Sequence, residues 1–235
     1  MRILAFETSA KAASVALMED SRLLGESYQN TGLTHSQTLM TMAEDLIKAC
    51  GFTPQDVEGV AVAAGPGSFT GVRIGVAAAK GFAWGKELPC WGVSTLETMA
   101  LNLGAYQGYV LPVMDARRAQ VYTALFYVNC GRYTRIREDR AISLQELGED
   151  IQNLTEPIFL VGDGSNLCYN TLEQCGNLIL PREHRLHQRA AGVALAAQAM
   201  IEAGLPADAA ALTPNYLRLS QAERERLAKQ QETKE

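Results

Sequence analysis

Apolar and polar positions along the first hundred residues alternate between strand-like runs and helix-like spacing. Short apolar runs predict strands, and apolar residues that recur every three or four positions predict helices. Thr34 and Gln37 have the spacing of a capping box, and Gly51 is placed to end the first helix. The predicted order is strands at 3–8, 14–18 and 23–26, a helix at 36–50, a strand at 57–63, a helix at 70–84, a strand at 90–93 and a helix from Ser94.

The same pattern of strands and helices begins again after a glycine-containing linker at 104–108. Each half runs as three strands, a helix, a strand, a glycine turn and a helix, which indicates a duplicated α/β architecture. Two such halves suggest two ribonuclease-H-like subdomains and the architecture of the actin-like ATPases. The expected units are an N-terminal subdomain at 1–105, a C-terminal subdomain at 106–219 and a charged tail at 220–235.

Composition narrows the class of protein. With 235 residues, 47% of them hydrophobic, the chain can bury a sizeable core. A net charge of −5 argues against a chain that holds nucleic acid by its own basic surface. Five dispersed cysteines without a CxxC pair indicate reduced thiols. No apolar run approaches a membrane span, and Glu7 comes too early for a signal peptide, so we expect a cytoplasmic protein.

A glycine-rich run at 65–75 follows one apolar strand and leads into a helix of small residues. Such a turn can direct backbone N–H groups at a phosphate, but Val72-Arg73 stands where a P-loop needs Lys-Ser/Thr. The run is therefore either a vestigial phosphate loop or a tight turn that packs the helix on its own strand. The residues of the vestigial site are Glu7, Thr8, Ser9, Gly65, Gly67, Ser68, Gly162 and Gly164.

Gly67, Gly71 and Gly75 recur at intervals of four residues and fall on one helical face. Glycine costs roughly 1 kcal/mol against alanine in a helix, so close packing must offset the row. Two surfaces can provide that packing: the chain's own sheet, or a helix of a partner subunit. The sequence leaves both open.

The histidines do not form a metal motif. Two ligands on one helical face require His at i and i+4, and Leu39 stands four residues after His35. His184 and His187 belong to a basic loop at 181–187 and lack a third ligand, so we expect no metal. The charged cluster at 115–118 ends a predicted strand; it can bind an anion or a partner's carboxylate, or be a solvated hairpin.

Several motifs together resemble the TsaB (YeaZ) family, and the resemblance spans nearly the whole chain up to the tail. Its most specific element is the run GPGSFTGVRIG at 65–75. The other motifs are residues 3–9, Thr34-His35-Ser36, the cluster at 115–118 with Val121-Tyr122, and residues 214–218.

The resemblance implies a non-catalytic subunit of the bacterial machinery that places threonylcarbamoyl on the adenosine following the anticodon of certain tRNAs. In that machinery TsaC makes threonylcarbamoyl-AMP, the metalloprotein paralogue TsaD transfers the group, and the ATPase TsaE resets the complex. TsaB pairs with TsaD through the first two long helices, and the same surface permits self-association. The chain would need no cofactor of its own, with ATP or ADP at the complex interface left open, and would meet tRNA only through the complex.

The resemblance also assigns residues. TsaD-like proteins carry His-x-x-x-His on the first helix, and Leu39 removes the second ligand here, which agrees with a subunit that is not an enzyme. Gly75→Leu is then expected to break assembly without unfolding the chain. The competing hypothesis is an autonomous actin-like ATPase or a metallopeptidase of the glycoprotease family. The expected interface residues are His35, Leu39, Met42, Ala43, Leu46, Gly71, Gly75, Ala78, Ala79 and Phe82.

Overall fold

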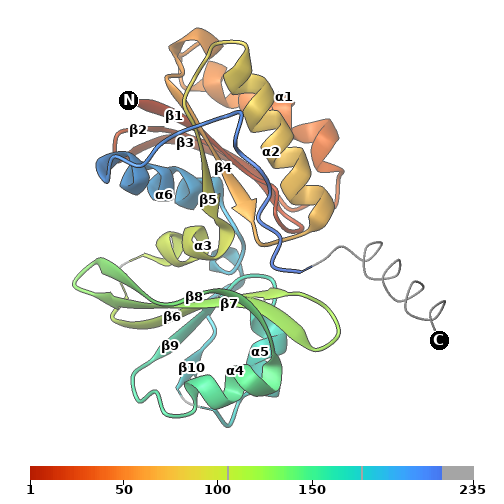
Figure 1. Cartoon of the computed structure of the whole chain (residues 1–235), viewed down its shortest axis with the longest axis vertical. Coiled ribbons are helices and arrows are strands. Elements are labelled where there is room, and N and C mark those ends of the chain that lie inside the picture. The colour runs from red at the N-terminus through yellow and green to blue at the C-terminus, as the bar shows by residue number, and fades with distance from the viewer. Residues whose placement is uncertain (105, 176, 219–235) are drawn as a thin grey trace, which may run out of the picture.

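The computed structural model describes residues 1–104, 106–175 and 177–218, and it contains two five-stranded sheets (Figure 1). The predicted tail at 220–235 lies outside the described residues. The first sheet and its helices comprise β1 (Arg2–Glu7), β2 (Ala13–Glu19), β3 (Arg22–Gln29), α1 (His35–Ala49), β4 (Gly59–Gly65), α2 (Phe69–Trp84) and β5 (Cys90–Ser94). The remaining elements are α3 (Thr95–Leu103), β6 (Gly108–Asp115), β7 (Gln120–Asn129), β8 (Arg132–Ser143), α4 (Leu144–Ile151), β9 (Ile158–Val161), α5 (Ser165–Thr171), β10 (Leu178–Ile179) and α6 (Ala190–Glu202), with short 3₁₀ turns at Pro54–Asp56 and Glu183–Arg185.

The two sheets have the same strand order. The first runs β3-β2-β1-β4-β5, and the second runs β8-β7-β6-β9-β10 when read from its opposite edge. In each sheet the first three strands are antiparallel and the last two join in parallel. The duplicated α/β architecture predicted from the sequence is confirmed.

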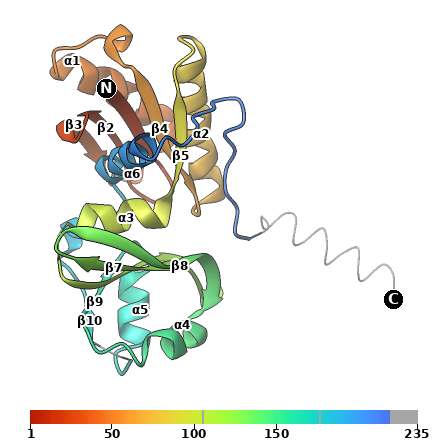
Figure 2. The same cartoon turned by 60° about the vertical axis from the view of Figure 1, so that its left-hand side comes forward.

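Helices cover both faces of the first sheet (Figures 1 and 2). The apolar sides of α1 and α2 pack with Leu4, Phe6 and Val62 on one face. The small residues of α6 pack with Ile3, Ala5 and other residues on the opposite face. Helix α3 lies between α6 and the second sheet, where it joins a core with β6 and β7. The far face of the second sheet is covered by α4 and α5.

The C-terminal segment corrects the expected domain boundary. The expected second subdomain at 106–219 includes helix α6, but the buried alanines of α6 pack on β1, β2 and β4 of the first sheet. Beyond α6, the Asn215 N–H donates to Ala64 O (2.6 Å), and the Lys80 ammonium donates to Ala210 O and Leu212 O (both 3.0 Å). The chain therefore returns to its first half after residue 189.

Most predicted elements are found within a few residues of their expected bounds. One local prediction is wrong: the Thr34 side chain makes no capping hydrogen bond, because the Gln37 N–H donates to the Thr34 carbonyl instead. Strand β10 was not predicted, since two residues are too few to show a pattern. Among the described residues, no helix has the length and apolar character needed to cross a bilayer.

Candidate functional site

The carboxyl end of β1 places Glu7 at the centre of the first candidate site. Its side chain is fully buried. The Ser9 N–H donates to Glu7 Oε1 (2.5 Å), whereas Glu7 Oε2 has no hydrogen-bond partner within the described chain. Burial raises the pKa of Glu7 to about 7, against the lowering effect of the Ser9 hydrogen bonds. Glu7 can therefore hold a proton near neutral pH.

The predicted phosphate cradle is filled by the chain's own strand end. The Ser68 N–H donates to Ser9 O (2.7 Å), so this backbone donor is already used. The Thr8 hydroxyl donates to Gly71 O (2.8 Å). Ser68 acts as the N-cap of α2, its hydroxyl accepting from the Gly71 N–H (3.3 Å). This arrangement is that of a packing turn, the second of the two interpretations of the glycine run.

The second glycine turn, at 162–164, is tied in a similar way. The Gly162 N–H donates to Leu186 O (2.6 Å), and the Gly164 N–H donates to Val113 O (3.0 Å). Gly162 has a φ of +108°, which an L side chain rarely adopts. Asp163 accepts from Gln188 Nε2 (3.3 Å), and burial raises its pKa, as does the charge of Asp115.

Glu7 of the first half and Asp163 of the second half lie close enough for their charges to interact. The charge of Asp163 contributes to the raised pKa of Glu7, although burial is the larger cause. On the same segments, the Ser9 hydroxyl, the Ser165 hydroxyl and Gln188 Oε1 are buried and have no hydrogen-bond partner among the residues that the structure describes. The meeting of the halves thus holds two carboxyl groups, and no lysine or arginine in the described chain forms an ion pair with either of them.

The glycine row at 67–75 packs on the residues that directly follow the chain's own β1. A Cβ at Gly67 would lie 2.6 Å from Ser9 O, and one at Gly75 would lie 2.5 Å from Thr8 Oγ1. A Cβ at Gly71 would clash with Thr8 O. Gly71 and Gly75 are buried by this contact, so they have no surface to offer a partner. The expectation that Gly75→Leu would leave the chain folded is therefore corrected.

The other expected interface residues divide by burial. His35 is partly buried, and its Nε2 donates to Ala10 O (2.8 Å), which ties the start of α1 to the loop after β1. Ala78 and Phe82 are partly buried. The remaining residues belong to the core against the first sheet and are Leu39, Met42, Ala43, Leu46 and Ala79.

The outer face of α1 and α2 carries exposed apolar residues that the sequence analysis did not single out. Met40 on α1 is 45% exposed, and Trp84 at the end of α2 is 74% exposed. On α2, Ala77 and Gly81 are exposed, and a Cβ at Gly81 would meet no atom. Ala77 and Gly81 lie four residues apart, so the sequence alone could have indicated this second small-residue face. The interpretation followed the longer row of Gly67, Gly71 and Gly75 instead. We use the name outer face for four exposed residues and for three half-buried residues that also pack against the core. The exposed residues are Met40, Ala77, Gly81 and Trp84, and the half-buried ones are Ile74, Ala78 and Phe82.

The segment at 214–218 acts as a strap over the start of α2. Tyr216 stacks on Phe69 with ring centroids 4.7 Å apart, and Arg73 Nε donates to the Tyr216 hydroxyl (2.7 Å). At its end, Arg218 Nη1 donates to Ala116 O (2.6 Å), next to the charged cluster at 115–118. That cluster is a β6–β7 turn in which Arg117 and Arg118 are exposed. Its solvated hairpin conformation is thus observed, with the Asp115 carboxylate accepting from the Arg117 N–H (2.7 Å).

Metal ligands do not gather in the described ranges: no three His, Cys, Asp or Glu side chains lie close enough to hold an ion. The Leu39 side chain is in the core, and His187 pairs with Glu183 (3.0 Å).

The repeated strand order and the facing turns at Glu7 and Asp163 define an α/β protein of the actin-like ATPase architecture, with two ribonuclease-H-like halves. Residues 29–226 match the family model described as TsaD, tRNA N6-adenosine threonylcarbamoyltransferase. Two curated relatives carry the description tRNA threonylcarbamoyladenosine biosynthesis protein TsaB. The Bacillus subtilis protein is 34% identical over 95% of this chain and 96% of its own length. The Escherichia coli protein is 38% identical over 70% and 72%.

A solved structure of YeaZ from Pseudomonas aeruginosa is 25% identical, covers 92% of this chain and 99% of its own, and superposes with a TM-score of 0.75. The chain therefore belongs to the TsaB (YeaZ) family.

Proposed function

We propose that this chain is the non-catalytic subunit that pairs with a TsaD-like transferase in tRNA threonylcarbamoyladenosine biosynthesis. Family membership supports the pathway, since the relatives carry it in their descriptions. The pathway further implies a cytoplasmic protein that works with a TsaE-like ATPase and reaches the modified adenosine of tRNA through the complex.

The observation that carries the pairing is the exposed apolar outer face of α1 and α2. Apolar residues exposed in a group on a monomer mark contact surfaces. Small residues at Ala77 and Gly81 allow another backbone to approach α2 closely, as a helix-to-helix interface requires. The proposed partner surface is therefore the outer face, in place of the buried residues that the sequence suggested, and a second copy of this chain can occupy it when the transferase is absent.

The filled glycine turn supports a subunit without nucleotide chemistry of its own. The Ser68 N–H already donates to Ser9 O and the Gly71 N–H to the Ser68 hydroxyl, so two backbone donors that a phosphate would need are in use. When they are ionised, the two carboxyl groups at the meeting of the halves also repel a phosphate anion unless a cation accompanies it. ATP or ADP, where present, would then belong to the interface with the transferase.

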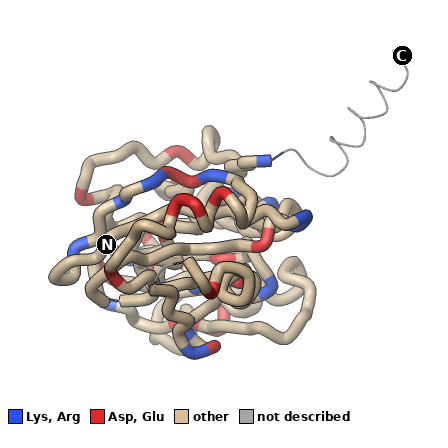
Figure 3. The backbone as a smooth tube through the Cα atoms, turned by 90° about the horizontal axis from the view of Figure 1, so that it is seen from below, with Lys and Arg blue, Asp and Glu red and all other residues tan. Residues whose placement is uncertain are grey.

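Surface charge agrees with a role in which tRNA is held mainly by the assembled complex. Seen from below, acidic and basic residues are interspersed along the backbone (Figure 3). A protein that grips nucleic acid by itself concentrates lysine and arginine on one face.

Reconstitution tests the proposal. Threonylcarbamoylation of tRNA is measured with TsaC-, TsaD- and TsaE-like proteins, with and without this chain. We expect modification to require the chain, and a matched Ala77→Arg variant to restore little of it. Full modification without the chain would contradict the proposal. ATP turnover or metal-dependent peptide cleavage by the isolated chain would instead support the autonomous enzyme.

A further inference from the structure

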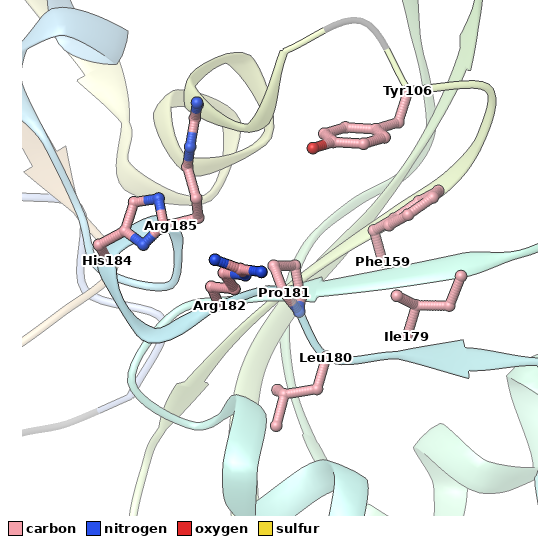
Figure 4. A pocket seen from close by; sticks show the side chains of 8 residues that line it. All are labelled: Tyr106, Phe159, Ile179, Leu180, Pro181, Arg182, His184 and Arg185. Carbon is pink, nitrogen blue, oxygen red and sulfur yellow. The ribbon is translucent and has the colours of Figure 1, made fainter.

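A pocket of about 390 Å³ lies in the second half of the chain (Figure 4). Its walls come from three separate parts of the chain: the linker before β6, strand β9, and the segment from β10 through the 3₁₀ turn at Glu183–Arg185. The volume falls within the range of roughly 300 to 1,000 Å³ that is typical of small-molecule sites. Nothing in the proposed subunit role uses this pocket.

One side of the pocket is aromatic and apolar. Tyr106 and Phe159 have ring centroids 4.9 Å apart and planes tilted by 35°. Tyr106 is 48% exposed and Ile179 is 40% exposed, so both keep open surface toward the pocket mouth. The exposed Tyr106 ring, packed on the half-buried Phe159, forms the kind of aromatic platform on which a planar base stacks.

The other side of the pocket is cationic. Figure 4 shows Arg182, His184 and Arg185 on the side away from Tyr106 and Ile179. All three are exposed, and within the described residues no carboxylate pairs with either guanidinium. The neighbouring Glu183 carboxylate is paired with His187 instead (3.0 Å). A guanidinium presents a planar fork of donors that matches a phosphate group.

We propose that this pocket binds a nucleotide, with the base on the Tyr106–Phe159 side and the phosphate on Arg182 and Arg185. The two chemical ends of the pocket match the two ends of one nucleotide, and a purely apolar or purely anionic ligand would use only one of them. The shared chemistry comes from two sources: a free nucleotide, or an unpaired residue of an RNA strand. This inference is independent of pairing with the transferase, because the isolated chain contains the whole pocket.

Calorimetric titration of the full-length chain tests the proposal with four probes: AMP, adenosine, ribose 5-phosphate and a single-stranded oligoadenylate of five residues. We expect saturable binding of AMP, with adenosine and ribose 5-phosphate each at least tenfold weaker, or about 1.4 kcal/mol. An oligoadenylate that binds at least tenfold more tightly than AMP identifies an RNA strand as the ligand. A smaller preference identifies the free nucleotide.

Variants locate the binding. Arg182→Gln with Arg185→Gln should weaken AMP at least tenfold, and so should Tyr106→Ala, which removes the ring. Arg132→Gln is the matched control, because Arg132 is also exposed but lies in the β7–β8 hairpin outside the pocket. Circular dichroism verifies that each variant is folded. Absence of saturable binding of AMP and of oligoadenylate, or unchanged affinity in both pocket variants, would overturn the proposal.

Discussion

Helix α2 has two faces built from small residues: one packs inside the chain, and the other is exposed. On the inner face, Gly71 and Gly75 let the helix approach Thr8 at the end of β1 so closely that a Cβ has no room. On the outer face, a Cβ at Gly81 would meet no atom, and Ala77 is exposed. A row of small residues therefore indicates close packing but does not identify the packing partner. Only burial separates the intramolecular contact from the surface left for another protein.

The largest effect is expected from a substitution on the inner face. Gly75→Leu places a side chain against Thr8 Oγ1 and against Val62 Cγ2, where a Cβ would already lie 2.5 and 3.2 Å away. We expect a loss of about 3 kcal/mol in the free energy of unfolding, because overpacking at a rigid core position cannot be relieved by side-chain motion alone. Urea denaturation measures it. Wild-type stability in this variant would show that α2 and β1 are not packed as described.

The next effect concerns Glu7, at the strand end on which the inner face packs. Its pKa is raised from 4.5 to about 7, so the folded chain binds the proton more tightly than the unfolded chain. The stability that this group contributes is full below pH 4.5 and is lost as the pH rises through about 7. At about 1.4 kcal/mol per pKa unit, the upper limit of the loss is about 3.5 kcal/mol.

Glu7→Gln keeps an oxygen for the Ser9 N–H and removes the ionisation. The variant should therefore exceed the wild type in unfolding free energy by up to about 3.5 kcal/mol at pH 8, and by much less at pH 5. Paired urea titrations at the two pH values give this difference. An equal difference at both values would mean that Glu7 does not titrate in the folded chain near neutral pH.

The smallest effect is expected from a substitution on the outer face. Gly81→Ala should stabilise the isolated chain by up to about 1 kcal/mol, since alanine favours the helix and nothing opposes its Cβ. Thermal unfolding measures the gain. A destabilisation of similar size would indicate an unrecognised contact at Gly81, and the same substitution at Gly71 provides the contrasting destabilised control.

Local patterns predicted the elements well because strands and helices are short-range features. The Ser143 cap predicts the start of α4, and the duplicated strand order follows from the restart of the pattern. Strand β8 was predicted only at 133–136 and runs from Arg132 to Ser143, because its charged residues hide the alternation. The sheet on which α6 packs could not be predicted, because a face of small alanines is compatible with either sheet; in the structure the alanines pack on the first sheet. For the same reason, Leu39 and Met42 could be placed on a helix but not assigned to the core or the interface. Arg182, Arg185 and Tyr106 meet only through the tertiary fold.

The most direct test of the account measures affinity between this chain and a TsaD-like transferase by calorimetry. Ala77→Arg places a long charged side chain on the exposed outer face, without touching the core. The account predicts an unchanged melting temperature and at least a tenfold weaker affinity, about 1.4 kcal/mol. Wild-type affinity in this folded variant would contradict the assignment of the outer face as the partner surface.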